Sequence, residues 1–207
     1  MITLADISNK IPPYGLIHDW LGREVVENLL RFAQQNEHRF EDTTLVGKSG
    51  SRVDRTRRVS KKLPNLGALE SELRTKLEGL LPAMFNRLGK QPFIPRKIEV
   101  ELVAHGDGAF FYRHIDTGTH SHLDHRARVF SAVYYFNALP KRFSGGILRL
   151  HSLTPSGQQG TFVDIAPDRD TIVFFPSFFP HEVLPVKCPS GQLLDSRFAI
   201  NFWVHQR

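Results

Sequence analysis

The chain has 207 residues, the length of one ordinary domain. Hydrophobic residues make up 41% and charged residues 23%, a composition that can bury a core and that excludes disordered and collagen-like chains. A single cysteine, Cys188, excludes an intramolecular disulfide and a zinc site built from several cysteines.

The surplus of positive charge is confined to one segment. The formal net charge is +6, and residues 48–62 carry seven lysines and arginines against one acid, so the rest of the chain is balanced. This distribution does not give a basic field over the whole surface, and the segment lacks the interleaved aromatics of a surface that stacks single strands, so we do not expect nucleic acid as the partner. The segment is either a solvated loop or a lid. A basic lid would suit an acidic peptide, a carboxylated small molecule or a phosphate-bearing carrier.

Signals for export and membrane insertion are not found. Residues 1–6 lack the basic stretch and apolar run of a secretory signal, and no run approaches 18 apolar residues. We therefore expect a soluble protein of a reducing compartment, the cytoplasm, without a membrane partner.

Helical periodicity marks the first part of the chain. Apolar residues from Leu21 to Ala33 recur with the 3.6-residue period after Asp19, which we expect to cap the helix. A second apolar stripe runs over residues 66–88, and Gly89 follows it as a stop signal. The polar and basic residues 41–62 between the two stripes indicate a loop or lid with room for a strand.

From residue 96 the pattern changes to the alternation of β-strands. The alternating runs, separated by Gly, Pro, Asp and Ser, are residues 98–103, 129–136, 147–150, 161–165, 171–175, 181–186 and 198–204. About eight short strands are typical of a β-sandwich or barrel, and a jelly roll fits the number. We expect a mainly β protein with N-terminal helices, a double-stranded β-helix in which residues 1–95 form a helical support with a basic loop, packed on a core of residues 96–207 as one structural domain.

Two histidines and an aspartate are the most informative residues for chemistry. Side chains two apart in a strand lie on one face, so His114 and Asp116 can bind one ion together. His181 opens a later alternating run and can supply a third ligand. Two histidines and a carboxylate on one face of an octahedron leave three positions open, the arrangement of a non-haem Fe(II) oxygenase. The His-x-Asp pair alone is common, and an isolated histidine here is equally compatible with a surface or core position.

Six motifs add a family resemblance. They are HID at 114–116, VYYFN at 133–137, FSGGILRL at 143–150, FFP at 174–176, HEVLPV at 181–186 and RFAINFW at 197–203. In this order, over about residues 98–205, the chain resembles the Fe(II)- and 2-oxoglutarate-dependent oxygenases of the prolyl 4-hydroxylase type. In its motifs it is most similar to the hypoxia-sensing prolyl hydroxylases and their bacterial relatives.

The resemblance implies an iron site and a cofactor site. His114, Asp116 and His181 match the metal ligands of the family. Arg197 matches the arginine that binds the distal carboxylate of 2-oxoglutarate, a role that suits the fork-shaped guanidinium. Tyr135 matches a hydroxyl donor to the same carboxylate. The implied cofactors are Fe(II) and 2-oxoglutarate, with ascorbate as a candidate stimulant.

Two further matches lie near the expected substrate. Arg128 matches an arginine at the substrate entrance, and its alternative is a salt bridge at the mouth of the barrel. Trp203 matches an aromatic residue beside the cofactor, and its alternative is core packing. Gly145 and Gly146 fit a tight turn rather than a ligand site.

The chain also departs from the family pattern. Residues 187–196 form an insertion after the third metal ligand, and Lys187 within it is a weaker rival for the cofactor carboxylate. His105 stands where relatives often have a tyrosine, and it either replaces that residue or points outward. Three more histidines form either a solvent-facing loop or a second metal site, and they are His120, His122 and His125.

The implied function is that of an enzyme, a 2-oxoglutarate-dependent Fe(II) dioxygenase. It would hydroxylate an unactivated C–H bond of a prolyl, peptidyl or amino-acid-derived substrate and release succinate and CO2. Asp116 favours hydroxylation over halogenation, because the halogenating relatives lack this carboxylate. The alternative is a non-catalytic, cupin-like metal-binding or sensor module. Such a module has no need of the carboxylate-binding pair Arg197 and Tyr135.

Overall fold

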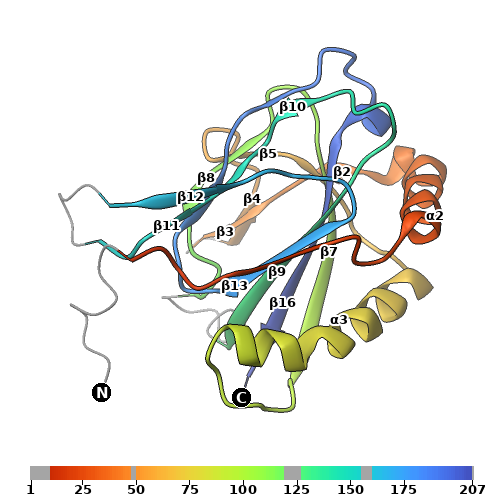
Figure 1. Cartoon of the computed structure of the whole chain (residues 1–207). Coiled ribbons are helices and arrows are strands. Elements are labelled where there is room, and N and C mark those ends of the chain that lie inside the picture. The colour runs from red at the N-terminus through yellow and green to blue at the C-terminus, as the bar shows by residue number, and fades with distance from the viewer. Residues whose placement is uncertain (1–9, 48–49, 119–126, 155–159, 207) are drawn as a thin grey trace.

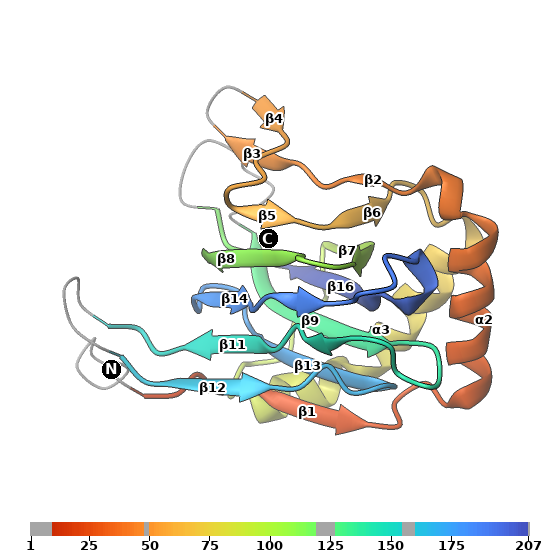
Figure 2. The ribbon, with the colours of Figure 1, turned by 90° about the horizontal axis from the view of Figure 1, so that it is seen from above.

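The computed structural model describes residues 10–47, 50–118, 127–154 and 160–206. Its centre is a pair of antiparallel sheets (Figures 1 and 2). The major sheet has the order β1 (Gly15–His18), β13 (Thr171–Pro176), β9 (Arg128–Phe136), β16 (Arg197–His205), β7 (Lys97–His105), β6 (Lys61–Leu63) and β2 (Glu41–Asp42). The minor sheet has the order β12 (Phe162–Ile165), β11 (Leu148–His151), β14 (His181–Val183), β8 (Phe110–His114) and β5 (Arg58–Val59). This is the predicted jelly roll.

Smaller elements decorate the two sheets. Two-stranded sheets pair β10 (Ser144–Gly145) with β15 (Val186–Lys187), and β3 (Leu45–Gly47) with β4 (Gly50–Arg52). The helices are α2 (Arg23–Gln35) and α3 (Ala68–Arg87), with short 3-10 turns η1 (Glu37–Arg39) and η2 (Leu193–Asp195). None of the helices in the described ranges is long and apolar enough to cross a membrane.

Both helices cover the outer face of the major sheet (Figures 1 and 2). Leu29, Leu77 and Met84 from the helices are fully buried in one cluster with sheet residues such as Leu102 and Phe202. A second, smaller apolar cluster lies between the two sheets. Side chains alternate along a strand, so the outer residues of β7, β9 and β16 pack against the helices. The inner residues of these strands face the other sheet and can form a site.

The first helix begins later than predicted, and Asp19 does not cap it. The N-cap is Gly22, and no side chain at that position accepts a hydrogen bond. Instead the carboxylate of Asp170, at the start of β13, accepts hydrogen bonds from the backbone N–H groups of Leu21 and Gly22. The cap was not predicted because it comes from about 150 residues away.

Residues before position 95 supply strands as well as helices. β1 pairs with β13, and β6 pairs with β7, both in the major sheet. β5 pairs with β8 in the minor sheet. The chain therefore crosses from one sheet to the other at Ser60, and the basic segment closes one side of the barrel.

Candidate active site

His114, Asp116 and His181 come together between the two sheets. One potential ligand atom from each lies within 4.8 Å of the others. His114 Nε2 is 3.6 Å from one oxygen of Asp116, and His181 Nε2 is 3.5 Å from the other. His114 ends β8, His181 begins the neighbouring β14, and the two residues are directly paired. Asp116 lies two residues beyond the end of β8, where its backbone N–H donates to the Ser177 carbonyl.

Both imidazoles are held in the tautomer that a metal requires. His114 Nδ1 is 2.9 Å from the carbonyl oxygen of Tyr112, and His181 Nδ1 is 3.0 Å from that of Phe179. A carbonyl can only accept, so each Nδ1 carries the proton and each Nε2 directs a lone pair at the centre of the triad. Burial, and then His114, lower the pKa of His181 to about 4, so this ring is neutral near pH 7.

The carboxylate of Asp116 is fixed from the major sheet. Ser131 Oγ on β9 donates to Asp116 Oδ2 at 2.6 Å, and it lies 2.9 Å from Ser177 Oγ. Burial alone raises the pKa of Asp116, but His181, His114 and the bond from Ser131 outweigh it and hold that pKa far below its usual range. The site therefore offers two imidazole nitrogens and one carboxylate oxygen, a donor set that suits iron(II).

Arg197 is buried inside the barrel with unused hydrogen-bonding groups. Its residue is only 1% exposed, and its guanidinium carbon lies 4.8 Å from the ring centre of Tyr135. Within the described ranges, Arg197 Nε, Arg197 Nη2 and the Tyr135 hydroxyl are buried without hydrogen-bond partners. Burial raises the pKa of Tyr135 to about 12, so its hydroxyl remains a donor. Unpaired buried donors are costly, and a carboxylate between these groups would satisfy them.

Two neighbours hold Arg197 in this position. His105, the residue opposite Arg197 on β7, points inward, and its Nδ1 lies 3.1 Å from Arg197 Nη1. Burial, then Arg197 and Arg58, hold the pKa of His105 well below its ordinary value, so the neutral ring accepts this bond. Gly146, with φ +66°, lies so close that a Cβ there would be 2.5 Å from Arg197 Cδ. Gly146 thus has a packing role beyond the expected turn.

The other predicted residues lie as follows. Arg128 forms an ion pair with Glu99, and its guanidinium carbon lies 4.2 Å from the ring centre of Trp203. The salt bridge considered for Arg128 is therefore present. Lys187 is exposed, in contrast to Arg197, so burial favours the arginine as the cofactor ligand. The three histidines at 120, 122 and 125 fall outside the described residues.

Ser131 and Glu101 were given no role from the sequence, whereas Arg58 belongs to the basic segment 48–62. Ser131 contacts Asp116, as described above. Arg58 and Glu101 form an ion pair at 3.2 Å inside the barrel. The alternation of β7 was a usable signal, because Glu99, Glu101, Val103 and His105 share one face. In the structure that face lines the site.

Comparison with known proteins identifies the class. Residues 100–205, about half of the chain, match the model of the 2OG-Fe(II) oxygenase superfamily. The chain belongs to this family, whose name states its dependence on 2-oxoglutarate and iron(II). The donor set of the triad and the unpaired groups of Arg197 and Tyr135 fit both cofactors.

Individual relatives agree with this assignment. An uncharacterized PKHD-type hydroxylase of Synechocystis sp. PCC 6803 is 32% identical over 94% of this chain. The match covers 63% of the relative's own length. A Pseudomonas putida prolyl-4-hydroxylase has a TM-score of 0.67 at 21% identity, covering 95% of this chain and 94% of that one. A Trichoplax adhaerens prolyl hydroxylase, solved with a hypoxia inducible factor peptide fragment, has a TM-score of 0.68 at 22% identity, covering 94% and 84%. At these identities, the two structures show a shared fold.

Proposed function

We propose that the protein is an Fe(II)- and 2-oxoglutarate-dependent dioxygenase that hydroxylates an unactivated C–H bond and releases succinate and CO2. The observation that carries this proposal is the pairing of two features in one interior. The triad His114, Asp116 and His181 offers a metal site with room for further ligands. Arg197 and Tyr135 beside it present buried donors that lack an acceptor.

In this proposal, residues of the chain bind the metal ion and 2-oxoglutarate and hold them in position. His114 Nε2, His181 Nε2 and an oxygen of Asp116 would hold the iron. Arg197 and Tyr135 would hold the distal carboxylate of 2-oxoglutarate. The bound cofactors supply the oxidising chemistry, in which dioxygen and 2-oxoglutarate yield succinate and CO2 while one oxygen atom enters the substrate C–H bond.

Aromatic rings pack on both imidazoles of the triad. The Phe111 ring stacks on the His114 imidazole with ring centres 3.6 Å apart, and Phe175 meets His181 edge-on at 4.9 Å. These contacts fix the planes of both imidazoles.

Two classes of substrate are candidates. One is a prolyl or other peptidyl residue, and the other is an amino-acid-derived small molecule. The prolyl hydroxylase fold of the structural relatives supports the first class. Neither class requires a further cofactor. The carboxylate of Asp116 supports hydroxylation over halogenation, because it fills the position that a halide would need.

Succinate release tests this proposal. Purified protein with Fe(II), 2-oxoglutarate and ascorbate in air should form succinate above the level of the metal-free protein, even before a substrate is known. Asp116→Ala should lower this rate at least 100-fold, since the variant loses the one anionic ligand. Asp168→Ala, at an exposed position outside the site, is the matched control. An Asp116→Ala rate equal to that of the control would remove Asp116 from the metal site.

A non-catalytic metal-binding module predicts a different result. Such a protein would bind iron at the triad without forming succinate, and 2-oxoglutarate would not alter its stability. The unpaired donors of Arg197 and Tyr135 weigh against it, because a metal module has no use for a buried carboxylate site.

A further inference from the structure

The inner face of the major sheet carries a charged wall at the level of the triad. Strand register sets Ser131 opposite Trp203, and Trp203 opposite Glu99. Asn201, one step along β16, is opposite Glu101. Ser131 binds Asp116, and at ordinary strand spacing Glu99 lies about 10 Å and Glu101 about 12 Å from Ser131 across the same face of the sheet.

Each glutamate faces an arginine that packs on an aromatic ring. Arg128 lies over Trp203 and pairs with Glu99. Arg58 Nη2 is 3.2 Å from Glu101 Oε1, and the guanidinium carbon lies 4.7 Å from the centre of Phe111. Phe111 in turn stacks on the metal-binding His114. Arg58 thus points into the barrel, with a side chain only 10% exposed.

The two pairs differ in how fully they are satisfied. Glu99 also lies 3.2 Å from Lys97 Nζ and 3.0 Å from His205 Nε2, so three cationic or polar groups surround it. Although burial raises the pKa of Glu99, Arg128 and Lys97 outweigh it and hold that pKa below its ordinary value. Glu101 has one arginine. Among the described residues, the bonds of Arg58 use Nε and Nη2, to Ser60 and Glu101, and those of Glu101 use Oε1. Arg58 Nη1 and Glu101 Oε2 are left for other partners.

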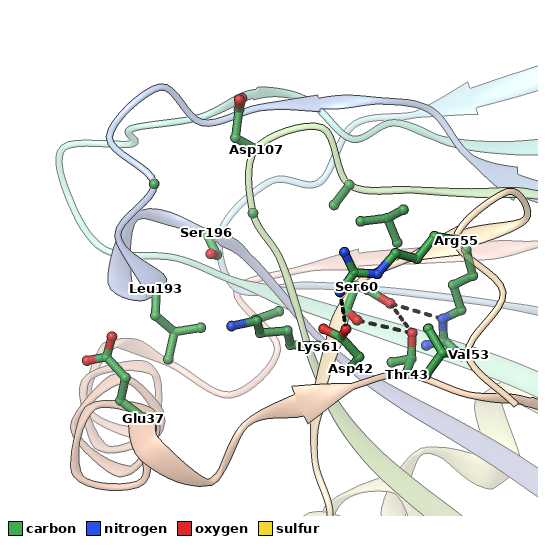
Figure 3. A pocket seen from close by; sticks show the side chains of 16 residues that line it. Glu37, Asp42, Thr43, Val53, Arg55, Ser60, Lys61, Asp107, Leu193 and Ser196 are labelled. Carbon is green, nitrogen blue, oxygen red and sulfur yellow. Dashed lines mark hydrogen bonds and ion pairs between the residues drawn. The ribbon is translucent and has the colours of Figure 1, made fainter.

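Arg58 is also reachable from solvent. It lines a cavity of about 410 Å³ at the edge of the two sheets, together with Arg55, Ser60 and Lys61. In Figure 3, Arg55, Thr43 and Ser60 gather on one side of this cavity, and Leu193 and Glu37 lie on the other. The described lining includes none of the three triad residues. A small solute in the cavity can therefore reach the Arg58 guanidinium.

The chemistry of the pair restricts what can bind beside it. An apolar ring pressed on Arg58 and Glu101 would remove water from two charges without replacing its hydrogen bonds. Arg58 and Glu101 neutralise each other, so a group with a single charge would add an uncompensated charge beside the pair. A group that carries both charges satisfies both, with its carboxylate on the guanidinium and its ammonium on the carboxylate.

We propose that Arg58 and Glu101 bind the ammonium and carboxylate of an amino-acid head group, so that the substrate is a free α-amino acid or a molecule that keeps this zwitterion. Arg58 Nη1 receives the carboxylate, Glu101 Oε2 receives the ammonium, and the side chain extends toward the triad. This inference rests on the proposed function and selects the second of its two substrate classes.

The test uses the full chain loaded anaerobically with Fe(II) and 2-oxoglutarate. The probes are the twenty free L-amino acids, each up to 50 mM, and N-acetyl-L-prolinamide as a capped prolyl residue. Binding is measured as a change in the iron-to-2-oxoglutarate charge-transfer band, and productive binding as added succinate in air. Each amino acid that responds is then compared with its N-acetyl and its amide derivative. We expect at least one free amino acid to respond, and each derivative to bind at least tenfold more weakly.

Variants assign the two charges separately. Glu101→Gln should weaken binding of the free amino acid at least tenfold. It should leave binding of the N-acetyl derivative unchanged, because that derivative has no ammonium. Arg58→Gln should weaken binding of the free amino acid and leave binding of the amide derivative unchanged. Arg58→Lys should bind the free amino acid with intermediate affinity. Arg57→Gln is the matched control from the same segment, because Arg57 is exposed, does not line the cavity and should leave every response intact. The charge-transfer band itself shows that each variant is folded and loaded.

Several outcomes would overturn the inference. One is a response to N-acetyl-L-prolinamide without a response to any free amino acid. Another is that no compound changes the band in protein that forms the full band. The third is that Glu101→Gln and Arg58→Gln leave the responses unchanged. Failure of the wild-type protein to form the band at all is a separate result, and it would remove the proposed function as well.

Discussion

Gly146 offers a sharp test of how Arg197 is positioned. A Cβ built at Gly146 would lie 2.5 Å from Arg197 Cδ and 3.0 Å from Arg197 Nε, whereas carbon atoms in ordinary contact are about 3.5–4.0 Å apart. Gly146→Ala must therefore push the guanidinium or the loop by about 1 Å. The cost to 2-oxoglutarate binding is that of one charge-assisted hydrogen bond, about 1.5–3 kcal/mol. We expect the dissociation constant to rise roughly 10- to 100-fold.

A second glycine separates this effect from backbone strain. Gly191 has φ +65°, close to the +66° of Gly146, but a Cβ there would meet nothing within 4 Å. Gly191→Ala and Gly146→Ala should both lose about 1–2 kcal/mol of unfolding free energy from the left-handed backbone. Only Gly146→Ala should weaken binding of 2-oxoglutarate, as measured by anaerobic titration of the Fe(II) protein. Equal affinity in the two variants would refute the idea that Gly146 sets the position of Arg197.

Two further predictions concern stability. Asp170 accepts hydrogen bonds from two backbone N–H groups at the start of α2 and from the Tyr134 hydroxyl at 2.8 Å. Asp170→Ala should lower the free energy of unfolding in urea by about 3 kcal/mol, and a loss under 1 kcal/mol would contradict this role. The pKa of His105 is held well below 6.5 by burial, then by Arg197 and Arg58, so below pH 6.5 the unfolded chain binds a proton that the folded one does not. The stability due to this ring is complete above pH 6.5 and falls as the pH decreases, by about 1.4 kcal/mol per unit. In urea titrations, the wild-type protein should lose about 1.4 kcal/mol more unfolding free energy between pH 7.5 and 5.5 than His105→Gln does. An equal loss in both proteins would mean that this ring is protonated in the folded state.

The layers of the fold could be predicted because their signals are local. The 3.6-residue stripe of α3 and the alternation of β7, β9 and β16 come from residues that are close in sequence and that face one core. The cap of α2 could not be predicted in this way. Asp170 lies far along the chain from the N–H groups it binds, and only tertiary packing brings them together.

Site residues that belong to a sequence motif could be predicted. Site residues whose position depends on how the strands pair could not. The structure brings together His114, Asp116 and His181, but local spacing alone connects only the first two. Phe111 is a case of the second kind. Simple alternation places it on the face opposite His114, yet an irregularity in the pairing of β8 with β14 turns both rings inward. Arg58 enters the barrel because β5 pairs with the other edge of β8, which no local pattern reveals.

One spectroscopic titration tests the central claim most directly. Fe(II) and then 2-oxoglutarate are added anaerobically to metal-free protein, and the visible spectrum is recorded after each addition. We expect a weak charge-transfer band that requires both additions, that is absent in His181→Ala, and that needs at least tenfold more 2-oxoglutarate in Arg197→Ala. Iron bound at the triad without such a band, or a band indifferent to Arg197→Ala, would contradict the assignment of this interior as an iron and 2-oxoglutarate site.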